Sequence, residues 1–119
     1  MYERVGGEQF FEELVDRFYE GVSSDPVLRP LYPEDLDAPN EHLRLFLIQY
    51  WGGPQTYNER RGHPRLRMRH APFVIGLPER DAWLRHMLAA LERAHLPAED
   101  HAEFAEYFRS TATQLINRV

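Results

Sequence analysis

The spacing of large apolar side chains is the feature that most constrains this fold. Between residues 10 and 22 they recur every three or four positions, which predicts an amphipathic helix. Comparable runs predict helices over about residues 40–51, 79–94 and 99–117. No segment shows the sustained alternation of apolar and polar residues that is typical of strands. The sequence therefore predicts an all-α fold with four main helices packed in pairs.

Length and composition predict a single domain over residues 1–119. A chain of 119 residues with 43% hydrophobic residues can bury a sizeable core, and no internal repeat or linker interrupts it. The longest apolar run, Leu45 to Ile48, is too short to span a membrane. Because the first residues also lack the character of a secretory leader, we expect a cytoplasmic protein without membrane contact.

Missing residue types and spacings exclude several kinds of chemistry. The chain has no cysteine, which excludes disulfides, thiol nucleophiles, iron–sulfur clusters, thiolate zinc sites and haem attached through CxxCH. All 14 basic residues are arginine, and without lysine neither Schiff-base chemistry nor a P-loop is available. No HxxxH or HExxH pattern occurs, and the Glu103–Glu106 pair lacks the ExxH partner of a di-iron bundle.

Positive charge is concentrated in one part of an otherwise acidic chain. The net charge is -5, yet residues 60–69 contain Arg60, Arg61, Arg65, Arg67 and Arg69. A basic segment of this kind suits a small anionic partner, although a solvated arginine-rich loop explains it equally well. Binding to nucleic acid is disfavoured because the flanking chain would repel phosphate.

The predicted helix at residues 40–51 is followed by a long irregular segment. The second half of this helix is apolar on almost every side, which predicts that other helices and some further group enclose it. Residues 33–39 are expected to form a loop, with Pro39 at the entry to the helix. Residues 54–77 are rich in proline and glycine and are expected to hold at most one short helix, at about residues 65–70. So long an irregular segment usually has a functional reason.

Two sets of side chains are candidates for a functional site. His70 closes the predicted short helix and precedes Ala71-Pro72-Phe73, a setting in which it could hold one axial position of a planar iron cofactor. Tyr19, Tyr32 and Trp83 lie on core-facing stripes, and their buried polar atoms need acceptors, which either a bound oxygen ligand or nearby carbonyls could supply. We expect the other histidines at the surface (His42, His95, His101), in a half-buried structural position (His86) or against an anion (His63).

Several motifs in order along the chain resemble the truncated haemoglobins of the second group. The central block is Tyr50-Trp51-Gly52-Gly53-Pro54 followed by residues 61–73, RGHPRLRMRHAPF. Supporting motifs are Gly6-Gly7, Phe18-Tyr19, Leu31-Tyr32-Pro33-Glu34-Asp35 and Arg80-Asp81-Ala82-Trp83-Leu84. The resemblance covers nearly the whole chain.

This resemblance implies a two-over-two helical globin sandwich that binds one non-covalent b-type haem. It assigns His70 as the iron ligand and places polar residues on the opposite, distal side: Tyr19, Tyr32 and Trp83. It also implies haem contacts from Phe46, Met68 and Phe73, and partners for the haem propionates in His63, Arg67 and Arg69. One departure concerns the loop at residues 33–39, which looks a residue short. Pro39 stands where the family usually has a small residue, and Leu43, one turn on, is expected to line the distal pocket.

The resemblance leaves more than one function open. The favoured hypothesis is a protein that binds O2, CO and NO tightly and releases them slowly, because distal donors stabilise the bound gas. The alternative is a haem redox enzyme, a nitric oxide dioxygenase or peroxidase-like protein, which would need an external reductase because the sequence has no flavin or nicotinamide domain. A haem-free helical interaction domain is the third hypothesis. Whether the chain forms a homodimer is left open.

Overall fold

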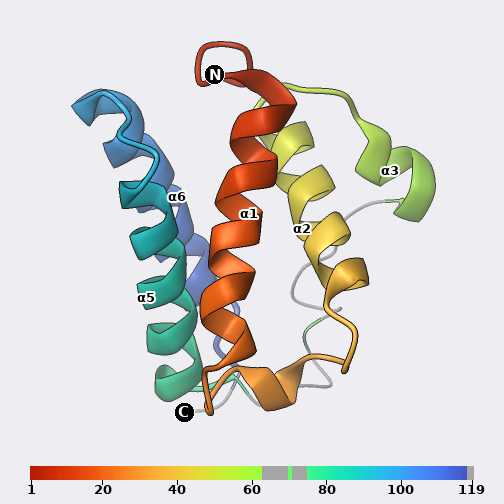
Figure 1. Ribbon diagram of the computed structural model, residues 1–119, viewed down its shortest axis with the longest axis vertical. Coiled ribbons are helices and arrows are strands. Elements are labelled where there is room, and N and C mark those ends of the chain that lie inside the picture. The colour runs from red at the N-terminus through yellow and green to blue at the C-terminus, as the bar shows by residue number, and fades with distance from the viewer. Residues whose placement is uncertain (63–69, 71–74, 118–119) are drawn as a thin grey trace.

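A computed structural model describes residues 1–62, 70 and 75–117 of the chain. Over these residues it is helical and contains no strand, which confirms the predicted all-α class (Figure 1). The elements are α1 (Gly7–Ser23), the 3-10 helix η1 (Arg29–Leu31), α2 (Asp37–Tyr50), α3 (Thr56–Arg61), α5 (Leu77–Glu92) and α6 (Ala98–Gln114). The short helix expected at residues 65–70 lies outside the described residues except for His70.

The main helices form two packed pairs, as predicted. α1 packs against α2 on one side and against α5 on the other, while α6 packs against α5 (Figure 1). The short helix α3 packs against α2. The central position of α1 means that its two flanks must both be apolar, and its buried side chains are Phe10, Phe11, Leu14, Val15, Phe18, Tyr19 and Val22.

A cluster of aromatic side chains joins the two pairs in the core. Phe11 and Phe18 of α1 and Phe104 of α6 have no exposed surface, and Phe108 is 1% exposed. The rings of Phe10 and Phe104 lie 5.5 Å apart between centroids. Full burial of each such side chain contributes about 1.5–3 kcal/mol to folding. The core therefore lies along α1 and extends to α5 and α6.

The predicted start of α2 was wrong. The helix begins at Asp37 and not at residue 40, so part of the expected loop at residues 33–39 is helical. Pro39 is tolerated because the N–H groups of a first helical turn have no partner within the helix. Asp35 supports the early start, since its carboxylate accepts a hydrogen bond of 2.9 Å from the Asp37 N–H.

Helix α3 was not predicted. Tyr57 is its only buried residue, so the apolar period of the sequence gives almost no signal there. Its position is set instead by polar contacts with α2. Gln49 exchanges two hydrogen bonds with Asn58, of 2.9 Å and 3.0 Å, and Arg60 forms a 2.6 Å ion pair with Glu41.

The ends of the other helices differ modestly from prediction. α1 begins three residues earlier than expected, α5 begins and ends two residues earlier, and α6 ends three residues earlier. The start of α5 is fixed by Glu79, whose carboxylate accepts a 2.7 Å hydrogen bond from the Gly76 N–H. Within the described residues, no helix combines the length and the apolar character that crossing a membrane requires.

His95, just after α5, should weaken the fold. Its φ of 53° is left-handed, a conformation that costs a residue with a β-carbon about 1–2 kcal/mol. We expect His95→Gly to raise the free energy of unfolding by about 0.5–1 kcal/mol, because the greater freedom of glycine in the unfolded chain offsets part of the gain. Urea denaturation measures this. His101→Gly, within helix α6, should instead lower stability, and a loss of stability in both variants would contradict the prediction.

Candidate functional site

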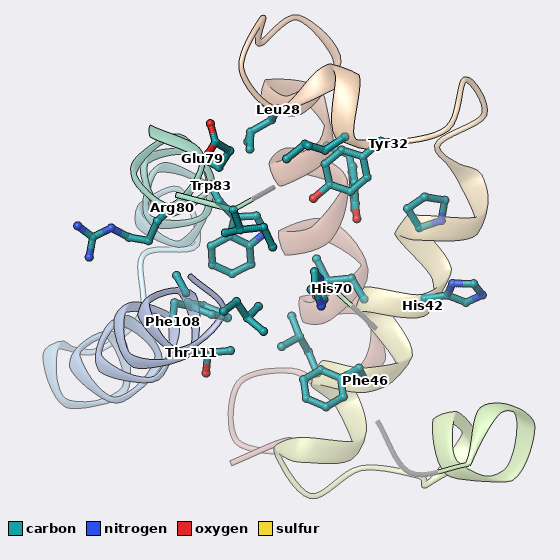
Figure 2. A pocket seen from close by; sticks show the side chains of 18 of the residues that line it. Leu28, Tyr32, His42, Phe46, His70, Glu79, Arg80, Trp83, Phe108 and Thr111 are labelled. Atoms are coloured by element: carbon teal, nitrogen blue, oxygen red, sulfur yellow. The ribbon is translucent and has the colours of Figure 1, made fainter. Parts of the chain in front are cut away.

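A cavity of about 410 Å³ lies between the two helix pairs (Figure 2). This volume falls in the range of small-molecule and cofactor sites. α1, η1, α2, α5 and α6 all contribute to its walls, which are mostly apolar. The apolar lining residues include Leu28, Leu31, Leu43, Phe46, Leu47, Ile75, Phe108 and Leu115.

Three polar aromatic residues, which we call the distal cluster, meet at one side of this cavity. Tyr19 comes from α1, Tyr32 follows η1, and Trp83 comes from α5. Both Tyr19 and Trp83 are hydrogen-bonded to the hydroxyl group of Tyr32, and the two tyrosine rings lie 5.6 Å apart, nearly perpendicular. An indole N–H can only donate, so Tyr32 is the acceptor toward Trp83. The interaction of the two tyrosines raises the pKa of Tyr19 and lowers that of Tyr32, as donation by Tyr19 would. With Tyr19 as the donor, the Tyr32 hydroxyl proton would be left for another acceptor.

Burial keeps the distal tyrosines neutral. It raises the pKa of Tyr32 to about 12, although the two hydrogen bonds that Tyr32 accepts oppose the rise. Burial also raises the pKa of Tyr19, and the neighbouring Tyr32 raises it further. Both hydroxyl groups therefore carry their protons throughout the neutral pH range and can act as donors.

His70 lines the same cavity, partly buried. Figure 2 shows Tyr32, Trp83 and Phe46 pointing into the space that His70 faces. Asn117, beyond the end of α6, bonds to the backbone of both His70 and Ile75. Its amide group donates a 3.2 Å hydrogen bond to the His70 carbonyl. Its side-chain oxygen and backbone N–H bond to Ile75 at 2.9 Å and 2.8 Å. Asn117 thus ties the backbone of His70 and of Ile75 to the end of α6.

The structure brings together seven of the residues that the sequence singled out. His70, the distal cluster, Pro39, Leu43 and Phe46 all line the cavity. The other predicted haem contacts lie outside the described residues: His63, Arg67, Met68, Arg69 and Phe73. His42, expected at the surface, keeps part of its surface exposed and also lines the cavity, with Nε2 3.0 Å from an Arg61 guanidinium nitrogen.

Several lining residues were missed by the sequence analysis. Arg61 belonged to the recognised basic segment but was not assigned to the site, and Arg80 was quoted only as part of a motif. Arg80 lies one helical turn before Trp83, so the helical period could have placed both on one face. Tyr107 and Thr111 are similarly one turn apart in α6 and are hydrogen-bonded to each other.

Two helix pairs around a mostly apolar cavity, lined by His70 and by the polar groups of the distal cluster, are the architecture of a globin. A family model of bacterial-like globins matches residues 1–117, and the chain belongs to this family. Its relatives place it among the group 2 truncated haemoglobins. The sequence is 41% identical to group 2 truncated hemoglobin YjbI of Bacillus subtilis over 117 residues. That match covers 98% of this chain and 88% of the relative.

Solved structures agree with this assignment. The hemoglobin of the phototrophic bacterium Chloroflexus aurantiacus matches with a TM-score of 0.96 and 59% identity, over 98% of this chain and 97% of that one. The thermostable hemoglobin of the actinobacterium Thermobifida fusca gives the same TM-score and identity, over 98% and 95% of the two chains. Membership of the family makes this a haem protein that binds gases.

The residues that line the cavity fit a haem group. The walls are mostly apolar, as a porphyrin plane requires, and cationic side chains that suit its propionates are present in Arg61 and Arg80. Over the residues that the structure describes, no three histidine or carboxylate side chains are grouped to hold a bare metal ion. An imidazole in a mostly apolar cavity suits iron whose other nitrogen ligands come from a macrocycle.

The buried tyrosines should make stability fall at high pH. Burial raises the pKa of Tyr32 and of Tyr107 to about 12, against about 10 for tyrosine in the unfolded chain. Between these values the folded state holds more protons than the unfolded state. The free energy of unfolding should therefore decrease as the pH rises from about 10 to about 12, by up to about 1.4 kcal/mol per pH unit for each tyrosine. Denaturation at a series of pH values measures this, and Tyr32→Phe should show a shallower decrease. Equal slopes in the two proteins would contradict the assignment to Tyr32.

Proposed function

We propose that this protein binds O2 and other diatomic gases tightly on a b-type haem, with His70 as the iron ligand and Tyr32 as the donor to the gas. The observation that carries the proposal is the grouping of Tyr19, Tyr32 and Trp83 in the wall of the cavity that His70 also lines. With Tyr19 and Trp83 bonded to its oxygen, Tyr32 would keep its own proton for a third partner. The haem, when bound, supplies the iron coordination position at which a gas is held.

His70 is suited to ligate iron because its imidazole lines an otherwise apolar part of the cavity. Neutral imidazole offers one nitrogen lone pair, and the apolar surroundings exclude water that would compete for the metal. The hydrogen bond from Asn117 to the His70 carbonyl restrains the backbone at this position. This restraint limits the directions in which the His70 side chain can point.

Tyr32 is suited to stabilise the gas. A gas that gains negative charge on binding is a charged acceptor, and a hydrogen bond to a charged acceptor contributes about 1.5–3 kcal/mol. Tyr19 and Trp83 both donate to the Tyr32 oxygen, which polarises its O–H group and fixes the direction in which it points. Slow release of the gas follows. A relative at 41% identity, from Bacillus subtilis, is described as an oxygen-avid truncated haemoglobin, which supports the same behaviour here.

His70→Ala tests the iron ligand. The variant should take up haem weakly, and the visible spectrum should lose the shifts that CO and O2 cause in the wild-type protein, because no other lining residue is proposed to bind the iron. His95→Ala is the matched control, since His95 is exposed and lies outside the cavity. A His70→Ala spectrum identical to that of the wild type would overturn the assignment.

Tyr32→Phe tests the donor. Losing a hydrogen bond to a charged acceptor should speed O2 dissociation by about 10- to 100-fold in a stopped-flow experiment. Tyr50→Phe is the control, because Tyr50 is 52% exposed and does not line the cavity. Dissociation at the wild-type rate from Tyr32→Phe would exclude Tyr32 as the stabilising group.

A further inference from the structure

Asp25, between α1 and η1, is a buried acidic residue that lies outside the cavity wall. Its side chain is 3% exposed, and each of its oxygens has two partners. Oδ1 accepts the N–H groups of Val27 and Leu28 at 2.7 Å and 3.1 Å. Oδ2 lies 3.0 Å from the Arg85 guanidinium and 2.6 Å from His86 Nε2, both on α5. Hydrogen bonding to His86 holds the pKa of the Asp25 carboxyl at about 2, so the group is ionised at neutral pH.

The other side of the His86 ring rests on α1. A β-carbon added to Gly21 would lie 2.3 Å from His86 Nδ1, much closer than real atoms approach. A side chain at position 21 would therefore force His86 or the backbone of α1 to move. The His86 side chain of α5 therefore lies between the backbone of α1 at Gly21 and the carboxylate of Asp25.

These contacts lie next to the distal cluster on both elements. On α5, His86 follows Trp83 by three residues, one helical turn away. In the turn between α1 and η1, Asp25 accepts a hydrogen bond from the Leu28 N–H. Leu28 lines the cavity with 2% exposure and stands just before η1, which leads directly to Tyr32. The link from Asp25 to His86 therefore joins the two chain segments whose ends meet in the hydrogen bond between Trp83 and Tyr32.

We propose that Asp25 and His86 are positioning residues that set the register of Tyr32 against Trp83, and through it the rate at which the cavity releases its gas. The inference rests on the proposed function, since it concerns the donor assigned there. Neither residue lines the cavity. Asp25 would fix the position of the chain from Leu28 to Tyr32, and His86 would fix the turn of α5 that carries Trp83. A buried carboxylate with four partners is suited to this task, because losing any one of them leaves a charged group unsatisfied.

Asp25→Asn is the first test, made on the haem-loaded ferrous protein. The amide has the same size, but its NH2 group cannot accept from Arg85 and can bond to His86 Nε2 only if the ring changes tautomer, so the link to α5 should weaken. We expect O2 dissociation to become about 3- to 10-fold faster, because the hydrogen bond from Tyr32 to the gas is weakened but not lost. The CO stretching frequency should shift toward the value measured in Tyr32→Phe.

Gly21→Ala tests the same link without changing a polar group. Its β-carbon must push His86 away from α1, and it should change the dissociation rate and the CO frequency in the same direction as Asp25→Asn. His86→Gln keeps a donor for Asp25 and should give a smaller change than His86→Leu. This pair of variants separates loss of the hydrogen bond from loss of the aromatic ring.

Asp100→Asn is the matched control. Asp100 is also buried, at 8% exposure, and forms a 2.7 Å ion pair with Arg4, but it does not line the cavity and its partner is not on α5. It should lower stability while leaving the dissociation rate and the CO frequency at wild-type values. An equal effect of Asp25→Asn and Asp100→Asn on these quantities would reduce Asp25 to a purely stabilising role and overturn the proposal.

A readout at Trp83 itself completes the test. In the CO complex, the indole N–H resonance of Trp83 should move and exchange faster with solvent in Asp25→Asn. The N–H of Trp51, the other tryptophan, should stay unchanged. If Trp83 is unmoved in Asp25→Asn, the positioning role fails. If Trp83 moves but Tyr32→Phe itself leaves dissociation unchanged, it is the proposed role of Tyr32 that fails.

Discussion

The packing of α1 between α2 and α5 is the constraint on which the rest of the structure depends. Phe11 and Phe18 have no exposed surface because both flanks of α1 are covered. Tyr19 shares this buried face, so the packing that hides Phe18 also places a hydroxyl group at the cavity. The same helix ends at Ser23, and the turn that follows carries the buried carboxylate of Asp25 to α5. The position of one helix therefore decides both the core and one side of the site.

The chemistry of the site follows from placing polar groups in apolar surroundings. A phenol in water exchanges partners freely, whereas a buried one must find a partner or lose the free energy of its hydrogen bond. Tyr32 has two donors and retains its own proton, and burial keeps that proton in place well beyond neutral pH. In the function proposed above, Tyr32 would meet the gas as a donor that is already protonated and held in place.

The two sides of the cavity are held by polar contacts of different strength. On the distal side, the ionised Asp25 is buried and bonded to two N–H groups and two side chains of α5. On the other side, Asn117 is exposed and reaches the His70 carbonyl and both backbone groups of Ile75. Water competes with the second set of bonds far more than with the first.

The sequence by itself determined the helical class, the pairing of the four main helices and, through its motifs, the cavity residues His70, Tyr19, Tyr32 and Trp83. The helices are local features, because apolar periodicity and turn residues act within a few positions of the chain. The specific pairing and the cavity residues came from the resemblance of whole motifs to a family. The sequence did not determine the early start of α2, which a contact between Asp35 and Asp37 supports, nor the existence of α3 or the cavity position of His42. The last two depend on contacts between different helices, such as Gln49 with Asn58 and Arg61 with His42.

The role of Asp25 shows the same division most clearly. In the sequence, Asp25-Pro26 marks only the end of a helix. The tertiary structure brings it 2.6 Å from His86, 61 residues further along the chain, with Gly21 against the other face of the ring. A hydrogen bond depends on distance and direction in space, and no local pattern encodes the distance between two helices. The sequence therefore determined which groups are available, and the tertiary structure decided which of them meet.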